Sequence, residues 1–441
     1  MTPSEDTSGT SGTPGTPGTS DVSGAPGTAH GRPLLNRRLA EFGTTIFAEM
    51  SALALRTGAI NLGQGFPDTD GPEEVREAAV RALRDGRGNQ YPPGPGVPEL
   101  RTAVAEHQLR HYGLSYDPDR EVLVTAGATE AIAAALLALV EPGDEVIALE
   151  PYYDSYAAAI ALAGGTRVPV TLRPREVSRG EGTERRFVLD LDELRDAVTP
   201  RTRLLLLNTP HNPTGTVLTR EELTEIAKLA VERNLLVVTD EVYEHLVFSD
   251  TAAPEGSGTP VHLPLASFPG MRERTVTIGS AGKTFSFTGW KVGWVTSTPD
   301  LVTAVRSAKQ YLTFVASGPF QYAVAEALAL PDTYFTEIRE DMRAKRDLLS
   351  AGLTAAGFDV YRPQGTYFVT TDIRPLGENR SHGGDGFAFC RALPERAGVV
   401  AIPNAVFYDH RQEGAPFVRF AFCKRKGVLE EAVTRLKRLA V

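Results

Sequence analysis

The chain has 441 residues, of which 41% are hydrophobic and 23% charged, a composition ordinary for a globular protein with two or three domains of about 150 residues each. Its 46 basic and 55 acidic residues give a net charge of −9, which argues against nucleic acid or an anionic membrane as the main partner, because both attract concentrated positive charge. Cys390 and Cys423 lack the spacing of metal ligands, so we expect no metal site. The apolar run at 131–140 has about half the roughly 20 residues of a membrane span, so we expect a soluble, cytoplasmic protein.

The N-terminal segment, residues 1–33, consists mostly of Thr, Ser, Gly and Pro. Such a segment buries too little apolar area to offset the entropy that is lost when a chain becomes ordered. We therefore predict a disordered tail, and we expect its removal to leave turnover intact.

From residue 121 onward, short apolar runs alternate with longer segments of helical period. The runs predict buried strands at REVLVTAG (120–127), GDEVIALE (143–150), TRVPVTL (166–172), RLLLLNTP (203–210), NLLVVTD (234–240) and RTVTIGS (274–280). Between two of them, residues 219–234 predict a helix that begins with a capping box of Thr219 and Glu222. The apolar face of this helix is formed by Leu223, Ile226, Ala227 and Ala230. This alternation predicts an α/β fold with a mostly parallel central sheet, in which ligands bind beyond the carboxyl ends of the strands.

Four of these strands are followed by residues suited to binding. A Gly-Ala-Thr turn, residues 127–129, opens a helix and offers free backbone N–H groups to a phosphate, although many such turns carry glycine for steric reasons alone. Asn212 lies in a turn stiffened by prolines, which is also a common loop closure. Asp240 ends a buried strand, where a carboxylate is costly unless it is paired or serves as a cap. Lys283 follows the last strand.

Lys283 lies in GSAGKTFSFTGW, a stretch with three interpretations. A nucleotide-binding phosphate loop needs four residues between its first glycine and the Gly-Lys pair, but only Ser280 and Ala281 separate Gly279 from the next glycine, so the spacing fails. A solvated loop lysine and a lysine that bonds to pyridoxal phosphate both remain open at this point.

The elements taken together favour the cofactor. A pyridoxal phosphate site needs a phosphate seat, an aromatic ring, donors for the phenolic oxygen, a carboxylate for the ring nitrogen and a lysine, and all occur at strand ends and at Tyr152-Tyr153. The chain resembles the class I aminotransferases of the fold-type I pyridoxal phosphate enzymes, in the kynurenine, glutamine and methionine aminotransferase branch, and is also similar to N-succinyldiaminopimelate aminotransferases. The resemblance spans about residues 60 to 425 and is carried by NLGQGFPD, NQYPPGPG, TAGATEAI, EPYYDSY, NTPHNPTG, TDEVYEHLVF, GSAGKTFSFTGWKVGW and VRFAFCK.

The resemblance implies roles around the cofactor ring. Lys283 is expected to bond to the cofactor and then to move the substrate proton, with a pKa lowered by burial. Asp240 is expected to hold the proton on the ring nitrogen, Asn212 and Tyr243 to donate to the phenolic oxygen, and Tyr153 to stack on the ring.

The resemblance also implies a phosphate seat. Its members are expected to be Gly127, Ala128, Thr129, Ser280 and Lys291, with Tyr91 reaching in from a second subunit. Relatives outside this branch carry arginine where Lys291 stands, and lysine lacks the two-pronged geometry of arginine. A shared Tyr91 implies a homodimer.

The expected substrate contacts centre on Arg419, which grips the α-carboxylate with two hydrogen bonds. Its alternative, a surface ion pair, fits poorly with the apolar run around it. Asn208 and the backbone of Gly65 are expected to border the carboxylate, and Phe47 and Phe314 to line an apolar side-chain pocket. Such a pocket fits methionine, leucine, glutamine or aromatic amino acids.

The predicted function is transfer of an amino group from an L-amino acid to a 2-oxo acid in two half-reactions. Two alternatives use the same site: transamination of N-succinyldiaminopimelate and β-elimination from cysteine conjugates. The first substrate has an extra carboxylate, and no second arginine that would bind it can be named from the sequence. A transcription regulator on this fold would need a DNA-binding module, which the tail lacks. The family implies a large domain at 67–315 and a smaller discontinuous α/β domain made of 34–66 and 316–441.

Overall fold

The structure, a computed structural model, describes residues 28–29, 32–43, 45–179, 182–248, 261–376 and 384–440. Most of the predicted disordered tail lies outside these ranges. Its described part pairs β1 (Thr28–Ala29) with β2 (Arg32–Pro33) in antiparallel fashion. These strands and the 3₁₀ helix η1 (Arg37–Leu39) belong to a unit that ends at Glu41, and residues 42–441 form a second compact unit.

A seven-stranded sheet forms the centre of the second unit, with the order β4-β12-β11-β10-β9-β5-β6. Its strands are β4 (Val122–Thr125), β5 (Glu145–Glu150), β6 (Thr166–Thr171), β9 (Thr202–Asn208), β10 (Leu236–Asp240), β11 (Thr275–Ser280) and β12 (Gly293–Thr296). Every predicted strand is present. The additional strand β12 was not predicted, and it runs antiparallel to both of its neighbours, whereas the pairs from β11 to β6 are parallel.

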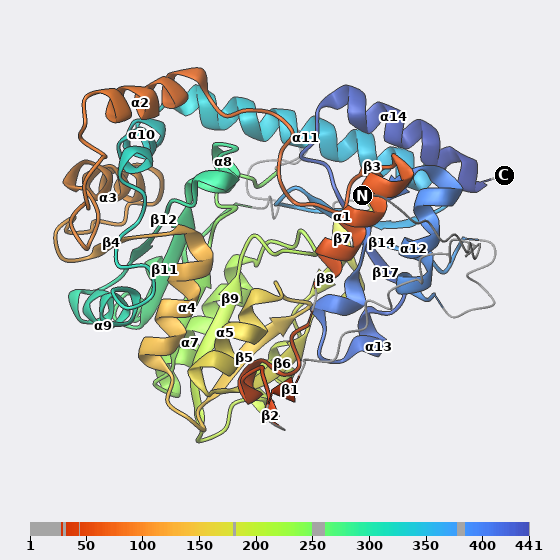
Figure 1. Cartoon of the computed structure of the whole chain (residues 1–441). Helices are drawn as coiled ribbons and strands as arrows, with labels where there is room; N and C mark the ends of the chain where they lie inside the picture. The colour runs from red at the N-terminus through yellow and green to blue at the C-terminus, as the bar shows by residue number, and fades with distance from the viewer. Residues whose placement is uncertain are drawn as a thin grey trace, which may run out of the picture. The chain divides into compact units, whose positions relative to one another are not determined.

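Both faces of this sheet are buried, which explains the uninterrupted apolar runs of its strands. Leu204 and Leu206 of β9 pack with α4 (Gly127–Leu139) and α5 (Ser155–Ala163) in one core. Leu205 and Leu207 pack on the opposite face with α7 (Arg220–Glu232), which begins with the predicted capping box. Figure 1 shows α4 and α5 lying along the strands.

A smaller antiparallel sheet, of order β13-β14-β17-β16, lies in the C-terminal part of the chain. Its strands are β13 (Asp359–Tyr361), β14 (Phe368–Asp372), β16 (Ile402–Pro403) and β17 (Phe417–Ala421). Its core also takes in residues of α1 (Ile46–Thr57), α11 (Asp332–Ala355), α12 (Gly386–Ala397) and α14 (Lys426–Leu436). Tyr243 and Leu246, from the turn after β10, belong to the same core and so tie the two sheets together. The division at 67–315 stays a prediction.

The remaining elements complete the second unit. The helices are α2 (Glu73–Arg84), α3 (Pro98–Tyr112), α6 (Leu191–Asp196), α8 (Ala281–Thr284), α9 (Pro299–Lys309), α10 (Gly318–Leu328) and α13 (Arg411–Gly414), with short 3₁₀ turns at Leu265–Ser267, Thr288–Trp290, Asn404–Phe407 and Lys437–Ala440. The strands are the hairpin β7 (Arg173–Arg179) and β8 (Gly182–Val188) and the parallel pair β3 (Ile60–Asn61) and β15 (Val399–Val400). None of the helices within the described ranges is long and apolar enough to cross a membrane.

Candidate active site

A cavity of about 280 Å³ lies where β9, β10 and β11 end. The predicted site residues that line it are Phe47, Gly65, Gly127, Ala128, Thr129, Tyr153, Asn208, Asn212, Asp240, Tyr243, Ser280, Lys283, Lys291 and Arg419. Asn208, Asp240 and Ser280 are the last residues of adjacent strands, so the parallel arrangement brings them to one edge of the sheet.

One end of the cavity is suited to an anion. Gly127 opens α4 with a φ of +78°, a conformation that favours glycine, and no side chain caps the first turn of this helix. The free N–H groups of the first turn and the positive end of the helix dipole therefore face the cavity. Lys291 adds a cation there, since a Cβ at Gly127 would lie 3.2 Å from its Nζ. Ser280 lies at the same end and accepts a hydrogen bond from Gly282 N at 3.1 Å.

Asp240 presents a buried carboxylate to the cavity. Tyr156 Oη donates a 2.6 Å hydrogen bond to Asp240 Oδ2, and Asn208 Nδ2 donates to the backbone oxygen of Asp240 at 2.8 Å. Burial raises the pKa of Asp240 to about 6, against the hydrogen bond from Tyr156, which lowers it. A cation beside this carboxylate, such as a protonated ring nitrogen, would relieve the cost of burying its charge.

Lys283, in α8, presents its amine to the same cavity. Burial lowers the pKa of Lys283 to about 8. The Nζ atom lies 5.7 Å from the ring centre of Tyr243 and 5.6 Å from that of Tyr367. A much larger fraction of this amine is therefore neutral near neutral pH than in an exposed lysine, as a nucleophile or base requires.

Arg419 is held on β17 and is 2% exposed, so it is not a surface residue. Its Nη1 donates to Asn212 Oδ1 at 2.8 Å and its Nη2 to Gly63 O at 3.1 Å, while its buried Nε has no partner among the described residues. Its guanidinium lies 4.0 Å from the centre of the Phe368 ring. Burial lowers the pKa of Arg419 to about 10, so that it stays charged at neutral pH. Each Nη atom has a second N–H beyond the bond that it makes, so this fixed, charged group suits a carboxylate.

The two asparagines are connected to this fork. Asn212 N donates to Asn208 Oδ1 at 2.8 Å, and the Asn208 amide is thus engaged on both sides by backbone groups. Asn208 therefore lines the cavity and positions Asn212. The Oδ1 atom of Asn212 accepts the hydrogen bond from Arg419, which leaves its Nδ2 group as the donor.

Tyr91 and Phe314 do not line the cavity. Their side chains are 81% and 53% exposed and pack edge to face, with ring centres 5.4 Å apart. A part for either of them in a complete site stays a prediction.

Several residues of the site were not predicted. Tyr156 belongs to the EPYYDSY stretch, but nothing in the sequence indicates that its hydroxyl bonds to Asp240. Phe368 lies against Gly65, where an added Cβ would come within 2.4 Å of its ring, so a larger residue than glycine does not fit. Gln64, Phe66 and Thr288 also line the cavity.

Pyridoxal phosphate fits this arrangement. The anion seat at α4, the buried carboxylate of Asp240, the amine of Lys283 and the ring of Tyr153 together match the parts of the cofactor. The large, mostly parallel sheet agrees with the fold-type I architecture that the sequence predicts. The family model of class I and II aminotransferases matches residues 57–436, and the chain belongs to this family. The protein is therefore a pyridoxal-phosphate-dependent aminotransferase.

Individual relatives support this assignment. The solved structure of N-succinyldiaminopimelate aminotransferase from Mycobacterium tuberculosis is 54% identical, has a TM-score of 0.84, and is matched over 92% of this chain and 100% of its own. Kynurenine–oxoglutarate transaminase from Dictyostelium discoideum is 38% identical over 92% of this chain and 96% of its own length. Methionine aminotransferase from Escherichia coli is 38% identical over 91% and 97%.

Proposed function

We propose that this aminotransferase takes its amino group from L-amino acids with apolar, aromatic, methionine-type or glutamine-type side chains and passes it to a 2-oxo acid. This proposal rests on the number of positively charged side chains that line the cavity. Among its described lining residues the cations are Lys283, Lys291 and Arg419. Since the first two are assigned to the cofactor, Arg419 remains for a single substrate carboxylate.

The walls beside Arg419 support an apolar side chain. The ring of Phe47 lies 5.5 Å from the guanidinium and that of Phe368 4.0 Å. Phe66, Ile132 and Val242 add further apolar surface to the cavity. Burying apolar area against such walls favours substrates at about 25 cal/mol per Å².

Each residue then has a task. Bound pyridoxal phosphate supplies an electron sink for the α-carbon of the substrate. Asp240 would hold a proton on the ring nitrogen, Asn212 would donate to the phenolic oxygen, and Arg419 would orient the α-carboxylate. The neutral amine of Lys283 accepts the α-proton and returns it, a task for which a pKa near 8 is suited.

A second candidate is transamination of N-succinyldiaminopimelate. It is favoured by the 54% identity to the Mycobacterium tuberculosis enzyme. The further carboxylates of such a substrate would need cations beyond those of the described cavity, which a second subunit could supply. Release of pyruvate from cysteine conjugates is a third outcome of the same site.

The proposal includes a cytoplasmic homodimer. The exposed pair Tyr91 and Phe314 supports a shared site, because aromatic side chains with this exposure are suited to an interface. The buried free thiols of Cys390 and Cys423 are compatible with a reducing compartment.

A spectroscopic titration tests the proposal. The holoenzyme is titrated with methionine, kynurenine, glutamine, glutamate and N-succinyldiaminopimelate, and then with 2-oxo acids, beside Lys283→Ala and the exposed-lysine control Lys228→Ala. We expect wild type and Lys228→Ala to show a cofactor band that methionine or kynurenine bleaches and an oxo acid restores, and Lys283→Ala to lack it. Bleaching by N-succinyldiaminopimelate alone would select the second candidate, and pyruvate release without an oxo acid the third. A band retained in Lys283→Ala would refute the site.

A further inference from the structure

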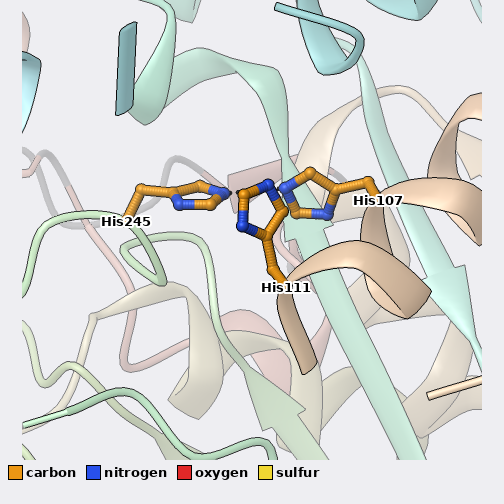
Figure 2. A group of neighbouring side chains, drawn as sticks. All are labelled: His107, His111 and His245. Atoms are coloured by element: carbon orange, nitrogen blue, oxygen red, sulfur yellow. Dashed lines mark hydrogen bonds between the residues drawn. The ribbon is translucent and has the colours of Figure 1, made fainter. Parts of the chain in front are cut away.

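Three histidines meet outside the active-site cavity. His107 and His111 are four residues apart on α3 and so lie on one face of that helix. His245 belongs to the turn after β10. One ring nitrogen from each of the three lies within 4.8 Å of the others, and the Nε2 atoms of His107 and His245 are 2.7 Å apart (Figure 2).

The cluster has an unused nitrogen and an entrance. His107 is 2% exposed, and the Nε2 atom of His111, which faces the cluster, is buried without a partner among the described residues. His111 and His245 are only partly buried, so an ion can reach them from solvent. Phe335 of α11 covers the cluster, with ring centres 4.3 Å from His245 and 5.0 Å from His111.

Burial keeps the imidazoles of His107 and His245 neutral. Burial first, and then the repulsion that a second charge on His111 or the charge of Arg110 would cause, lowers the pKa of His107 to about 3. Arg110 is itself paired with Asp332 at 2.5 Å. Burial likewise lowers the pKa of His245, with Arg339 among the further causes. Neutral imidazoles keep the lone pair that a metal ion requires.

We propose that His107, His111 and His245 bind one divalent transition-metal ion of the zinc class, with water as the fourth ligand. An all-nitrogen donor set excludes calcium and magnesium, which take oxygen ligands. With Zn–N bonds of about 2.0–2.1 Å, neighbouring nitrogens of a tetrahedral site are about 3.3 Å apart. The nitrogens of the three histidines are between 2.7 and 4.8 Å apart, which brackets this value. Side-chain adjustments that break the direct His107–His245 contact therefore suffice to bring the three nitrogens to the distances of a tetrahedral site.

The ion would join two distant parts of the chain. It would fix α3 to the turn after β10, which also carries Tyr243 and follows directly on Asp240. It would therefore stabilise the segment that holds the cofactor ring without entering the cavity. This inference does not depend on the substrate of the enzyme.

Metal titration of the holoenzyme tests the site. The full chain without an affinity tag, dialysed free of unbound cofactor because that also binds metals, is titrated with Co²⁺ and then with Zn²⁺. His111→Gln and His245→Gln each remove one ligand, and His410→Gln removes an exposed histidine outside the cluster. Retention of the cofactor absorption shows that each variant is folded. His111 is partly exposed, so its replacement is the one least expected to disturb folding.

We expect one Co²⁺ per chain in wild type and His410→Gln, with the intense visible absorption of a four-coordinate ion, displaced by Zn²⁺. The affinity should fall at least about tenfold in each ligand variant, a change of about 1.4 kcal/mol. Zn²⁺ should raise the melting temperature of wild type and not that of the ligand variants. Absence of stoichiometric binding, or wild-type affinity in either folded ligand variant, would overturn the proposal and leave a histidine pair joined by a hydrogen bond.

Discussion

Replacing Asp240 with asparagine should stabilise the cofactor-free protein while removing activity. The substitution keeps the shape of the side chain and an oxygen that can accept from Tyr156. It removes only the charge, which burial makes costly.

The size of the effect follows from the pKa of Asp240. The pKa of Asp240 in the folded protein, about 6, lies above the ordinary aspartate value of 3.8, so folding favours the protonated form. The stability that this group contributes is complete below about pH 4 and is lost as the pH rises through about 6. At pH 8 the cost to the wild-type apoprotein is (6 − 3.8) × 1.36, or about 3 kcal/mol. Asparagine avoids this cost, and the difference should shrink by about half at pH 5.

Urea denaturation of the two apoproteins at pH 8 and pH 5 measures this difference. Asp192→Asn, at a side chain that is 90% exposed, serves as the control and should change little. Turnover of Asp240→Asn should fall by about 100- to 1000-fold, since an amide does not stabilise a protonated ring nitrogen. An Asp240→Asn apoprotein that is less stable than wild type at pH 8, or a stability difference that does not change with pH, would refute the reasoning.

Three further predictions concern neighbouring groups. Acylation of Lys283 in the apoprotein, followed by mass spectrometry, should rise with a midpoint near pH 8, because burial lowers its pKa to about 8; a midpoint near 10 would contradict this. Arg419→Lys should lower kcat/KM by about 10- to 100-fold for amino acid and oxo acid substrates alike, because one charged hydrogen bond contributes about 1.5–3 kcal/mol. A loss confined to substrates with one class of side chain would argue against carboxylate binding. Tyr156→Phe removes a hydrogen bond that lowers the pKa of Asp240, so the pH below which cofactor binding weakens should rise by about 1–2 units. An unchanged pH dependence would show that the Tyr156 hydroxyl has no part in stabilising the Asp240 carboxylate.

The strands and their end residues could be predicted from the sequence because the signals are local. Each predicted strand is a run of apolar residues, and parallel strands place their carboxyl ends at one edge. The strand β12 was not predicted because it begins shortly after the Thr288–Trp290 turn, in a stretch without a longer apolar run. The bond from Tyr156 to Asp240 joins residues 84 apart, and the contact of His107 with His245 joins residues 138 apart. Pairings over such separations depend on how α3, α5 and the turn after β10 pack, which no single stretch specifies.

The cavity draws its parts from regions that can change independently. Asp240 and Ser280 lie at the ends of buried strands, where a substitution disturbs a core covered on both faces. Phe47 and Phe66, which line the cavity, come from α1 and the loop after β3, outside the large sheet. Evolution can therefore alter these two walls while the chemical apparatus is inherited unchanged.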